Sequence, residues 1–312
     1  MPIEQHVALI LGKNMSSKRL SKNALKRYTF GYALVAPAFI ILVVFFVWPL
    51  IQGLKISFYS GLGVRGVFVG SQNYTGTLTD PRFWNSFRVS MIFTFSIVVF
   101  SGLFGLLLAI ALLKKPRMYV LYIAAAFMPY ITTPVIGALI WNNLLADPFG
   151  IINVVLTSLG FQSVPWLKTP VLALISIIFI QVWYTIGYNA VLFMAGLQAI
   201  PTSYYEAAEI EGCGFFHKLV YITIPLLIPT IIFVAVISTL YGFVNSYILA
   251  ELVTGGGPFE ATNVMLSYVF EYAFDRFDLG RANAVTMITF VLFTGLAFIQ
   301  FNYQKKKFFG LY

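Results

Sequence analysis

Six long stretches without a charged residue constrain the fold of this chain more than any other feature. An α-helix needs about 20 consecutive apolar residues to cross the hydrocarbon core of a bilayer, and each stretch is longer than that. The composition agrees, because 59% of the 312 residues are hydrophobic and only 10% are charged. A membrane β-barrel would show alternating polarity, which the stretches lack. We therefore predict an all-α, polytopic membrane protein with six transmembrane helices, within residues 28–54, 89–113, 118–146, 169–205, 219–250 and 282–304.

The basic residues orient these helices, since Lys and Arg accumulate in short cytoplasmic segments. With the amino terminus inside the cell, thirteen of the twenty basic residues fall in cytoplasmic segments, and six spans place both termini there. The predicted organisation is a basic cytoplasmic segment over 1–27, a transmembrane domain over 28–304 and a basic cytoplasmic tail over 305–312. The net charge of +9 is interpreted as topology and contact with anionic lipid head groups, with no role for nucleic acid.

Two of the apolar stretches cannot be simple spans. Pro129 and Pro134 lie within the third stretch, and each removes a backbone donor, so a break near the middle of the membrane is expected. The stretch 169–205 is too long for one crossing, and we place the span at about 171–196. The remainder belongs to a cytoplasmic segment that continues to about residue 224.

The chain lacks the residues that most catalytic or ion-coupled membrane proteins need. No predicted span holds an ionisable side chain, although proton-coupled carriers usually keep one there as a relay. Sodium-coupled carriers can use backbone carbonyls instead, so a secondary carrier stays possible. No Gly-x-x-x-x-Gly-Lys-Ser/Thr loop for nucleotide is present, and the only histidines are His6 and His217. We predict no catalytic residue, no metal site and no cofactor in this chain, which is not expected to be an enzyme.

The cytoplasmic segment 197–224 carries the most specific pattern. It is predicted to form two short helices joined at Gly212, which would adopt the left-handed conformation that ends a helix. Ser203 followed by Glu206 three residues later matches a capping box. Small side chains beside a carboxylate, at Ala207 and Ala208, suit insertion into a groove of a partner protein.

This segment resembles the Glu-Ala-Ala loop of binding-protein-dependent ABC importer permeases. The resemblance rests on Glu206-Ala207-Ala208, on Gly212 and on Ile224-Pro225 at the family spacing. It implies the type I ABC importer fold, with the loop forming coupling helices that dock into an ATPase subunit. By the same resemblance, Glu206, Ala207, Ala208 and Gly212 transmit the ATP-driven movement, and Pro225 starts the next span. The family's Asp-Gly-Ala is replaced by Glu-Gly-Cys here, and Ile224 stands where Leu is usual.

The resemblance extends to the extracytoplasmic segments, where several motifs are typical of the first permease subunit of maltose-type and glycerol-3-phosphate-type importers. It implies a place in a bacterial inner membrane beside a second homologous permease, two ATPase subunits that bind ATP and Mg²⁺, an extracytoplasmic solute-binding protein and a saccharide. The motifs include Asn73-Tyr74, Asp80 to Trp84, Trp141 with Gly150 and Asn153, Thr254 to Pro258, and Gly280 to Ala284.

Two helices carry polar and aromatic stripes that have two interpretations. Aromatic rings stack on sugars and amides bind hydroxyls, so Tyr184, Tyr188, Asn189, Asn245 and Tyr247 are candidates for a saccharide path. Small and polar residues also hold transmembrane helices together, and this packing role is the alternative.

The predicted function is that of a permease subunit that forms half of the path for a sugar or oligosaccharide. A phosphorylated or acidic saccharide is the alternative cargo, and a carrier independent of ATP is the alternative class. No Lys or Arg lies inside a span to attract an anion, which favours a neutral sugar. Glu271, Asp275 and Asp278 could meet the binding protein or simply form a solvated acidic face.

Overall fold

The computed structural model describes residues 22–62, 66–113 and 117–308, with side chains for those from Phe30 to Asn302. Within these ranges the regular structure is helical, apart from a single bridge between Tyr59 and Phe68, which confirms the all-α prediction. The helices, including four π-helical turns labelled η, are α2 (Lys22–Leu42), η1 (Val43–Val47), α3 (Trp48–Ile56), α4 (Gln72–Leu78), α5 (Pro81–Leu113), α6 (Tyr119–Ile131), α7 (Pro134–Leu144), α8 (Ile151–Ser158), α9 (Pro170–Gln198), α10 (Thr202–Ile210), α11 (Phe215–Lys218), η3 (Leu219–Thr223), α12 (Ile224–Leu249), η4 (Ala250–Thr254), α13 (Met265–Phe270), η5 (Glu271–Asp275) and α14 (Leu279–Phe308).

The chain divides into two units, Met1–Gly53 and Leu54–Tyr312. In the first, α2, η1 and α3 follow one another without a break, so the helix begins at Lys22, inside the segment predicted to be a cytoplasmic extension. The residues from Phe30 to Leu50, apart from Ala36, are exposed, as expected for a helix surrounded by lipid and partner helices. The rest of the segment 1–27 lies outside the described residues.

The predicted spans correspond to the long helices of the structure. Among the described residues, five helices are long and apolar enough to cross a membrane, and α6 with α7 makes a sixth if this bent pair is one span. The pair bends by 98°. Pro134 begins α7 and Thr132 takes an extended conformation, whereas Pro129 stays within α6, so the predicted break occurs at the second proline only. The five long helices cover Phe30–Ile56, Pro81–Leu113, Pro170–Gln198, Phe215–Thr254 and Leu279–Asn302.

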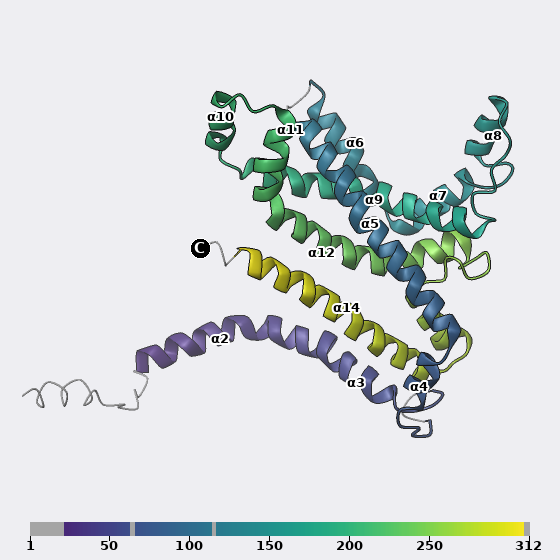
Figure 1. The fold of residues 1–312 in the computed structure, drawn as a ribbon. Helices are drawn as coiled ribbons and strands as arrows, with labels where there is room; N and C mark the ends of the chain where they lie inside the picture. Colours follow the sequence, from purple (N-terminus) through teal and green to yellow (C-terminus); the bar gives the residue numbers. More distant parts are fainter. Residues whose placement is uncertain (1–21, 63–65, 114–116, 309–312) are drawn as a thin grey trace, which may run out of the picture. The chain divides into compact units, whose positions relative to one another are not determined.

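The centre of the second unit is α9, which packs against α5, α6 and α12 (Figure 1). Glycines allow these helices to approach closely. A Cβ on Gly105 would lie 2.8 Å from the Cβ of Asn189, and one on Gly187 would overlap the carbonyl oxygen of Ala126. Close approach through small residues is how membrane helices associate, because lipid gives apolar side chains no preference for one another.

The segment between α7 and α9 contains the short helix α8. Asn153 on this helix is fully buried, and its Oδ1 accepts hydrogen bonds from the Val164 amide and the Trp166 indole. One polar side chain therefore closes α8 back onto the loop that follows it.

Candidate functional site

The loop that we predict to be cytoplasmic consists of α10, a two-glycine joint and α11, so the two predicted short helices are present. The expected capping box is wrong. The residue that precedes α10 is Pro201, with φ −59° and ψ 134°, and no side chain caps the helix. Because the helix begins right after Pro201, Ser203 already lies within its first turn and cannot cap it.

Gly212 has the left-handed conformation that the sequence predicted, with φ +75°. The amide of Cys213 donates to the carbonyl of Ala208 over 2.9 Å, and the amide of Gly212 donates to that of Glu209 over 3.0 Å. This pair of bonds is the Schellman motif, which satisfies two carbonyls at the end of α10. The chain then turns directly into α11.

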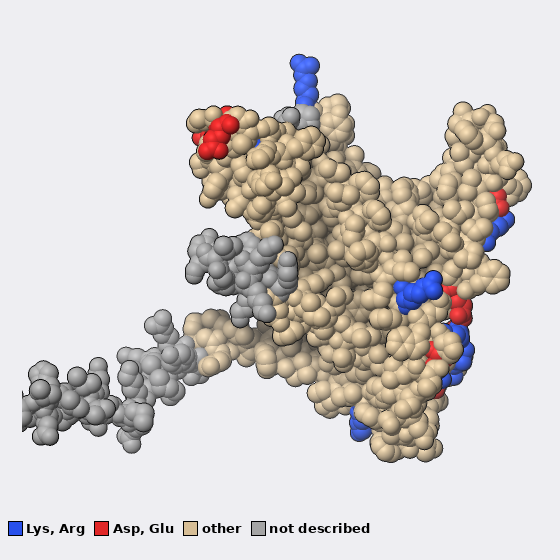
Figure 2. Space-filling model, in the orientation of Figure 1, with Lys and Arg blue, Asp and Glu red and all other residues tan. Residues whose placement is uncertain are grey.

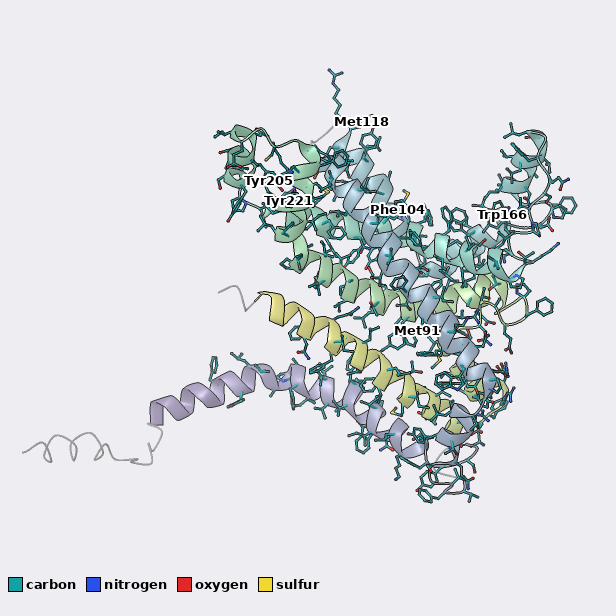
Figure 3. The ribbon with its side chains drawn as sticks, viewed as in Figure 1. Met91, Phe104, Met118, Trp166, Tyr205 and Tyr221 are labelled. Carbon is teal, nitrogen blue, oxygen red and sulfur yellow. The ribbon has the colours of Figure 1, made fainter. Side chains whose placement is uncertain are left out.

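Two side-chain contacts hold α10 against the helix that follows. Lys218 pairs with Glu209 over 2.7 Å, and the hydroxyls of Tyr205 and Thr223 share a hydrogen bond of 3.0 Å. Figure 3 shows Tyr205 on α10 beside the turn that carries Tyr221. The loop is thus attached to the long helix by an ion pair at one point and a hydroxyl contact at another.

Pro225 does not begin the next helix. The helical path runs from Phe215 through α11, η3 and α12 to Thr254, and Pro225 is the second residue of α12. The π-helical turn η3 comes directly before it. Because proline has no amide hydrogen, a local change in the hydrogen-bond pattern lets the helix continue past it. The long helix therefore extends from the cytoplasmic loop across the membrane as one element.

One face of α10 is open. Glu206 and Ala207 are exposed, and so is Ile210, whose side chain is 88% accessible. Ala208 is buried against the rest of the loop. The three residues of the Glu-Ala-Ala motif therefore differ in position. Glu206 and Ala207 are available to a partner, whereas Ala208 packs within the loop. Ile210 was not predicted, although its spacing of three and four residues from Ala207 and Glu206 places it on the same face.

The polar stripes of α9 and α12 also split into distinct groups. Tyr188 is half-buried and stacks on Tyr130 of α6, with ring centroids 4.4 Å apart. Tyr241 of α12 lies edge-on to both rings, and its hydroxyl bonds that of Tyr130. Asn245 lies one turn further along α12 and is half-buried. Tyr130 was missed, because the sequence does not reveal that the break after α6 brings it beside Tyr188.

Asn189 and Tyr184 are engaged in contacts between helices. The amide of Asn189, 1% exposed, donates to Ser101 of α5 over 2.9 Å and to Ser238 of α12 over 3.2 Å. The hydroxyl of Tyr184 donates to the carbonyl of Thr133 over 2.9 Å, where α6 gives way to α7. These are the packing contacts that the alternative interpretation of the stripes expected.

On the face of the second unit that Figure 2 shows, charged side chains gather away from the middle. Beyond the acidic α10, they occur near the far end of α12, where Arg82 forms a bidentate pair with Glu271 over 2.7 and 2.9 Å and a second pair with Glu260 over 2.7 Å. The hydrogen bonds from Arg82 lower the pKa of Glu271, although its burial acts in the opposite direction. Glu271, predicted to meet a partner or solvent, is instead part of an internal ion-pair network.

A second network centres on Asp80. Its carboxylate accepts hydrogen bonds of 2.7 Å from Tyr268 and from Arg281. Burial alone would raise the pKa of Asp80, but the Tyr268 hydroxyl, the Arg82 amide and the charges of Arg281 and Arg82 together lower it. The motifs after Asp80 and around Arg281 thus meet in space and join α5 to α14.

Long apolar helices joined by a loop of two short helices with an open face define a multi-pass helical membrane protein. Among the described residues, no group of three His, Cys, Asp or Glu side chains could hold a metal ion. Residues 66–307 match the family of binding-protein-dependent transport system inner membrane components, and the chain belongs to this family.

Its relatives cover nearly the same length. The sn-glycerol-3-phosphate transport system permease protein UgpA of Agrobacterium fabrum is 34% identical over 278 residues, which is 88% of this chain and 94% of that protein. The trehalose/maltose transport system permease protein MalF of Thermococcus litoralis is 31% identical over 280 residues, 89% of this chain and 94% of that protein.

Solved structures show the same fold. A chain of a bacterial ABC transporter involved in the import of the acidic polysaccharide alginate superimposes with a TM-score of 0.81 and 20% identity, covering 93% of this chain and 99% of its own. The chain is therefore a multi-pass inner-membrane permease with the type I ABC importer fold, as the sequence predicted.

Proposed function

We propose that this chain forms half of the path for a neutral sugar or oligosaccharide and transmits the movement of an ATPase through α10. The observation that carries the proposal is the exposed Glu206 and Ala207 face on a helix fixed by the Gly212 turn. A rigid helix attached to α12 can convert a push from a partner into movement of a transmembrane element.

The proposed complex contains a second homologous permease, two ATPase subunits that bind ATP and Mg²⁺, and an extracytoplasmic solute-binding protein. One solved relative of the same fold is a complex with a periplasmic protein bound to alginate pentasaccharide, which supports the last of these partners. ATP binding would bring the ATPase subunits together, displace α10 and open the path toward the binding protein.

For the path itself we propose Tyr188, Tyr130, Tyr241 and Asn245. Three phenol rings and an amide offer stacking surfaces and hydroxyl partners without a fixed charge, which suits an uncharged sugar. We assign Tyr184 and Asn189 to packing, because both are buried and bound to other helices. The names of the relatives, which include glycerol-3-phosphate and trehalose/maltose systems, support a small polyhydroxylated solute and keep a phosphorylated one as the second candidate.

The test is uptake of labelled saccharides into proteoliposomes that hold the complete complex, with and without the ATPase subunits. The proposal expects uptake only with ATPase, ATP and binding protein present. It also expects Tyr188→Ala to lower uptake while ATP hydrolysis without solute is kept. Uptake that continues in liposomes without the ATPase would identify a secondary carrier instead and overturn the proposal.

A further inference from the structure

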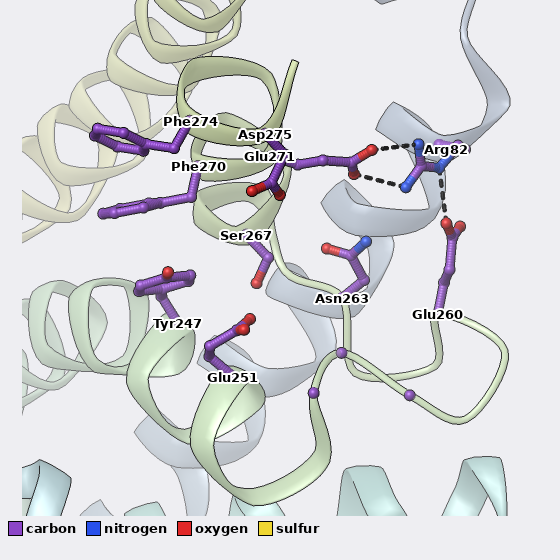
Figure 4. Close-up of a pocket in the computed structure, with 13 residues that line it drawn as sticks. Arg82, Tyr247, Glu251, Glu260, Asn263, Ser267, Phe270, Glu271, Phe274 and Asp275 are labelled. Atoms are coloured by element: carbon purple, nitrogen blue, oxygen red, sulfur yellow. Dashed lines mark hydrogen bonds and ion pairs between the residues drawn. The ribbon is translucent and has the colours of Figure 1, made fainter. Parts of the chain in front are cut away.

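A cavity of about 560 Å³ opens at the end of α12 that lies away from the cytoplasmic loop (Figure 4). Its walls come from the end of α12, from the loop Gly255 to Gly257 and from α13 with η5. The volume lies within the range of roughly 300–1,000 Å³ that small-molecule sites have. Because α12 begins at the cytoplasmic loop and is 26 residues long, the cavity lies on the extracytoplasmic side.

One wall of the cavity is aromatic. Tyr247 stacks on Phe270 with centroids 4.2 Å apart and an interplanar angle of 14°, and Phe274 continues the row at 5.2 Å from Phe270. Phe274 is 62% exposed, so its ring remains open to a ligand. Stacked rings that end in an open face provide the flat apolar surface on which a sugar ring packs.

The cavity has an excess of negative charge. Glu260 and Glu271 are neutralised by Arg82, and Glu271 also by Arg276. Glu251 and Asp275 also line the cavity, and neither has an ion pair within the described residues. Two carboxylates without partners therefore lie beside the aromatic row and repel any anion that enters.

Two uncharged side chains complete the lining. Asn263 is 9% exposed, points from its loop into the cavity in Figure 4, and its Oδ1 has no hydrogen-bond partner. The hydroxyl of Ser267 has none either. Both atoms are enclosed by protein and unpaired, and buried polar atoms are nearly always paired, so a rotation of either side chain toward the cavity would let it pair with a hydroxyl of a ligand.

We propose that this cavity is an extracytoplasmic subsite for one sugar ring that carries no anionic group. The ring packs on Phe270 and Phe274, its hydroxyls bind Asn263 and Ser267, and Glu251 and Asp275 exclude phosphorylated and uronic sugars. This inference rests on the proposed function and decides between its two candidate cargoes. It also separates Tyr247, whose ring stacks on Phe270, from the path residues Tyr188 and Tyr241, whose rings contact Tyr130.

The test uses the complete complex in lipid nanodiscs, without ATP and without the binding protein. Saturation-transfer NMR measures the binding of methyl α-glucoside, methyl α-glucuronide and glucose 6-phosphate to wild type, to Phe274→Ala and to the double variant Glu251→Gln, Asp275→Asn. Asp147→Asn makes the same chemical change at an ion pair outside the cavity and serves as the matched control. All variants are compared for thermal unfolding, and ATP-driven uptake is measured in the same preparations.

We expect wild type to bind the glucoside and to exclude both anions, and Phe274→Ala to weaken glucoside binding at least about fivefold. The double variant should bind the anions at least about fivefold better while glucoside binding stays within about twofold. The control should match wild type. Equal binding of glucoside and glucuronide by wild type, or no change in the double variant, overturns the subsite. ATP-driven uptake that persists in that case leaves the proposed function standing, whereas uptake without ATPase overturns both.

Discussion

The turn at Gly212 gives the sharpest prediction about the cytoplasmic loop. No atom lies within 4 Å of the position where a Cβ would stand, so Gly212→Ala causes no clash. The substitution destabilises the turn only through the φ of +75°, because this left-handed conformation costs a residue with a Cβ roughly 1–2 kcal/mol. That energy corresponds to an increase of about 5- to 30-fold in the fraction of loops whose turn is open.

Hydrogen exchange of the peptide that contains Cys213 measures this opening, because the Cys213 amide bonds the Ala208 carbonyl in the closed turn. In the purified complex we expect exchange to accelerate most in Gly212→Ala and less in Gly212→Asn, since Asn tolerates the left-handed conformation. Gly214→Ala is the control, because Gly214 has φ −72° and open space around it. Equal acceleration in Gly212→Ala and Gly214→Ala would refute the reasoning.

Three further predictions concern the rest of the molecule. Asn189→Ala should lower thermal stability by about 1–2 kcal/mol through the loss of two hydrogen bonds, and a change in solute preference at unchanged stability would contradict the packing role. Gly187→Ala should prevent stable folding, because the new Cβ would overlap the Ala126 carbonyl. Gly102→Ala places its Cβ where no atom lies within 4 Å and should be tolerated. Size-exclusion chromatography of the two variants measures the difference. The pKa of Glu271 is lowered on folding, so its ion pairs stabilise the folded protein above the unfolded pKa of 4.5. This stabilisation is lost as the pH falls through the lower pKa of the folded state. Thermal unfolding between about pH 6 and 3 should therefore depend on pH less steeply in Glu271→Gln than in wild type.

The spans and the cytoplasmic loop were predictable because each depends on local sequence. The length of an apolar stretch determines where a helix can cross the membrane. The left-handed turn that ends α10 favours a glycine, and Gly212 is found at that position. The capping box at Ser203 failed because the pattern was matched without locating the start of the helix. α10 begins at Thr202, directly after Pro201, and this boundary decides which side chain can cap the helix.

The roles of the polar stripes could not be predicted from the sequence. Asn189 and Tyr188 are adjacent in the chain, yet one is buried between three helices and the other is half-buried in a cluster of phenol rings. Only the packing of α5, α6 and α12 around α9 distinguishes them. The pairing of Arg82 with Glu271 joins residues 189 positions apart, and no local pattern indicates such a contact.

The central claim is that Glu206 transmits force without contributing to the fold. Its side chain is exposed, and it makes no hydrogen bond or ion pair within the described residues, so Glu206→Ala should leave thermal unfolding unchanged. The most direct measurement is solute-stimulated ATP hydrolysis by the reconstituted complex, comparing wild type with Glu206→Ala and with Glu211→Ala, an exposed carboxylate at the other end of α10. The account predicts that solute no longer stimulates ATP hydrolysis in Glu206→Ala. This loss is expected whether the variant complex stays assembled or releases its ATPase subunit. Full stimulation in Glu206→Ala would contradict it.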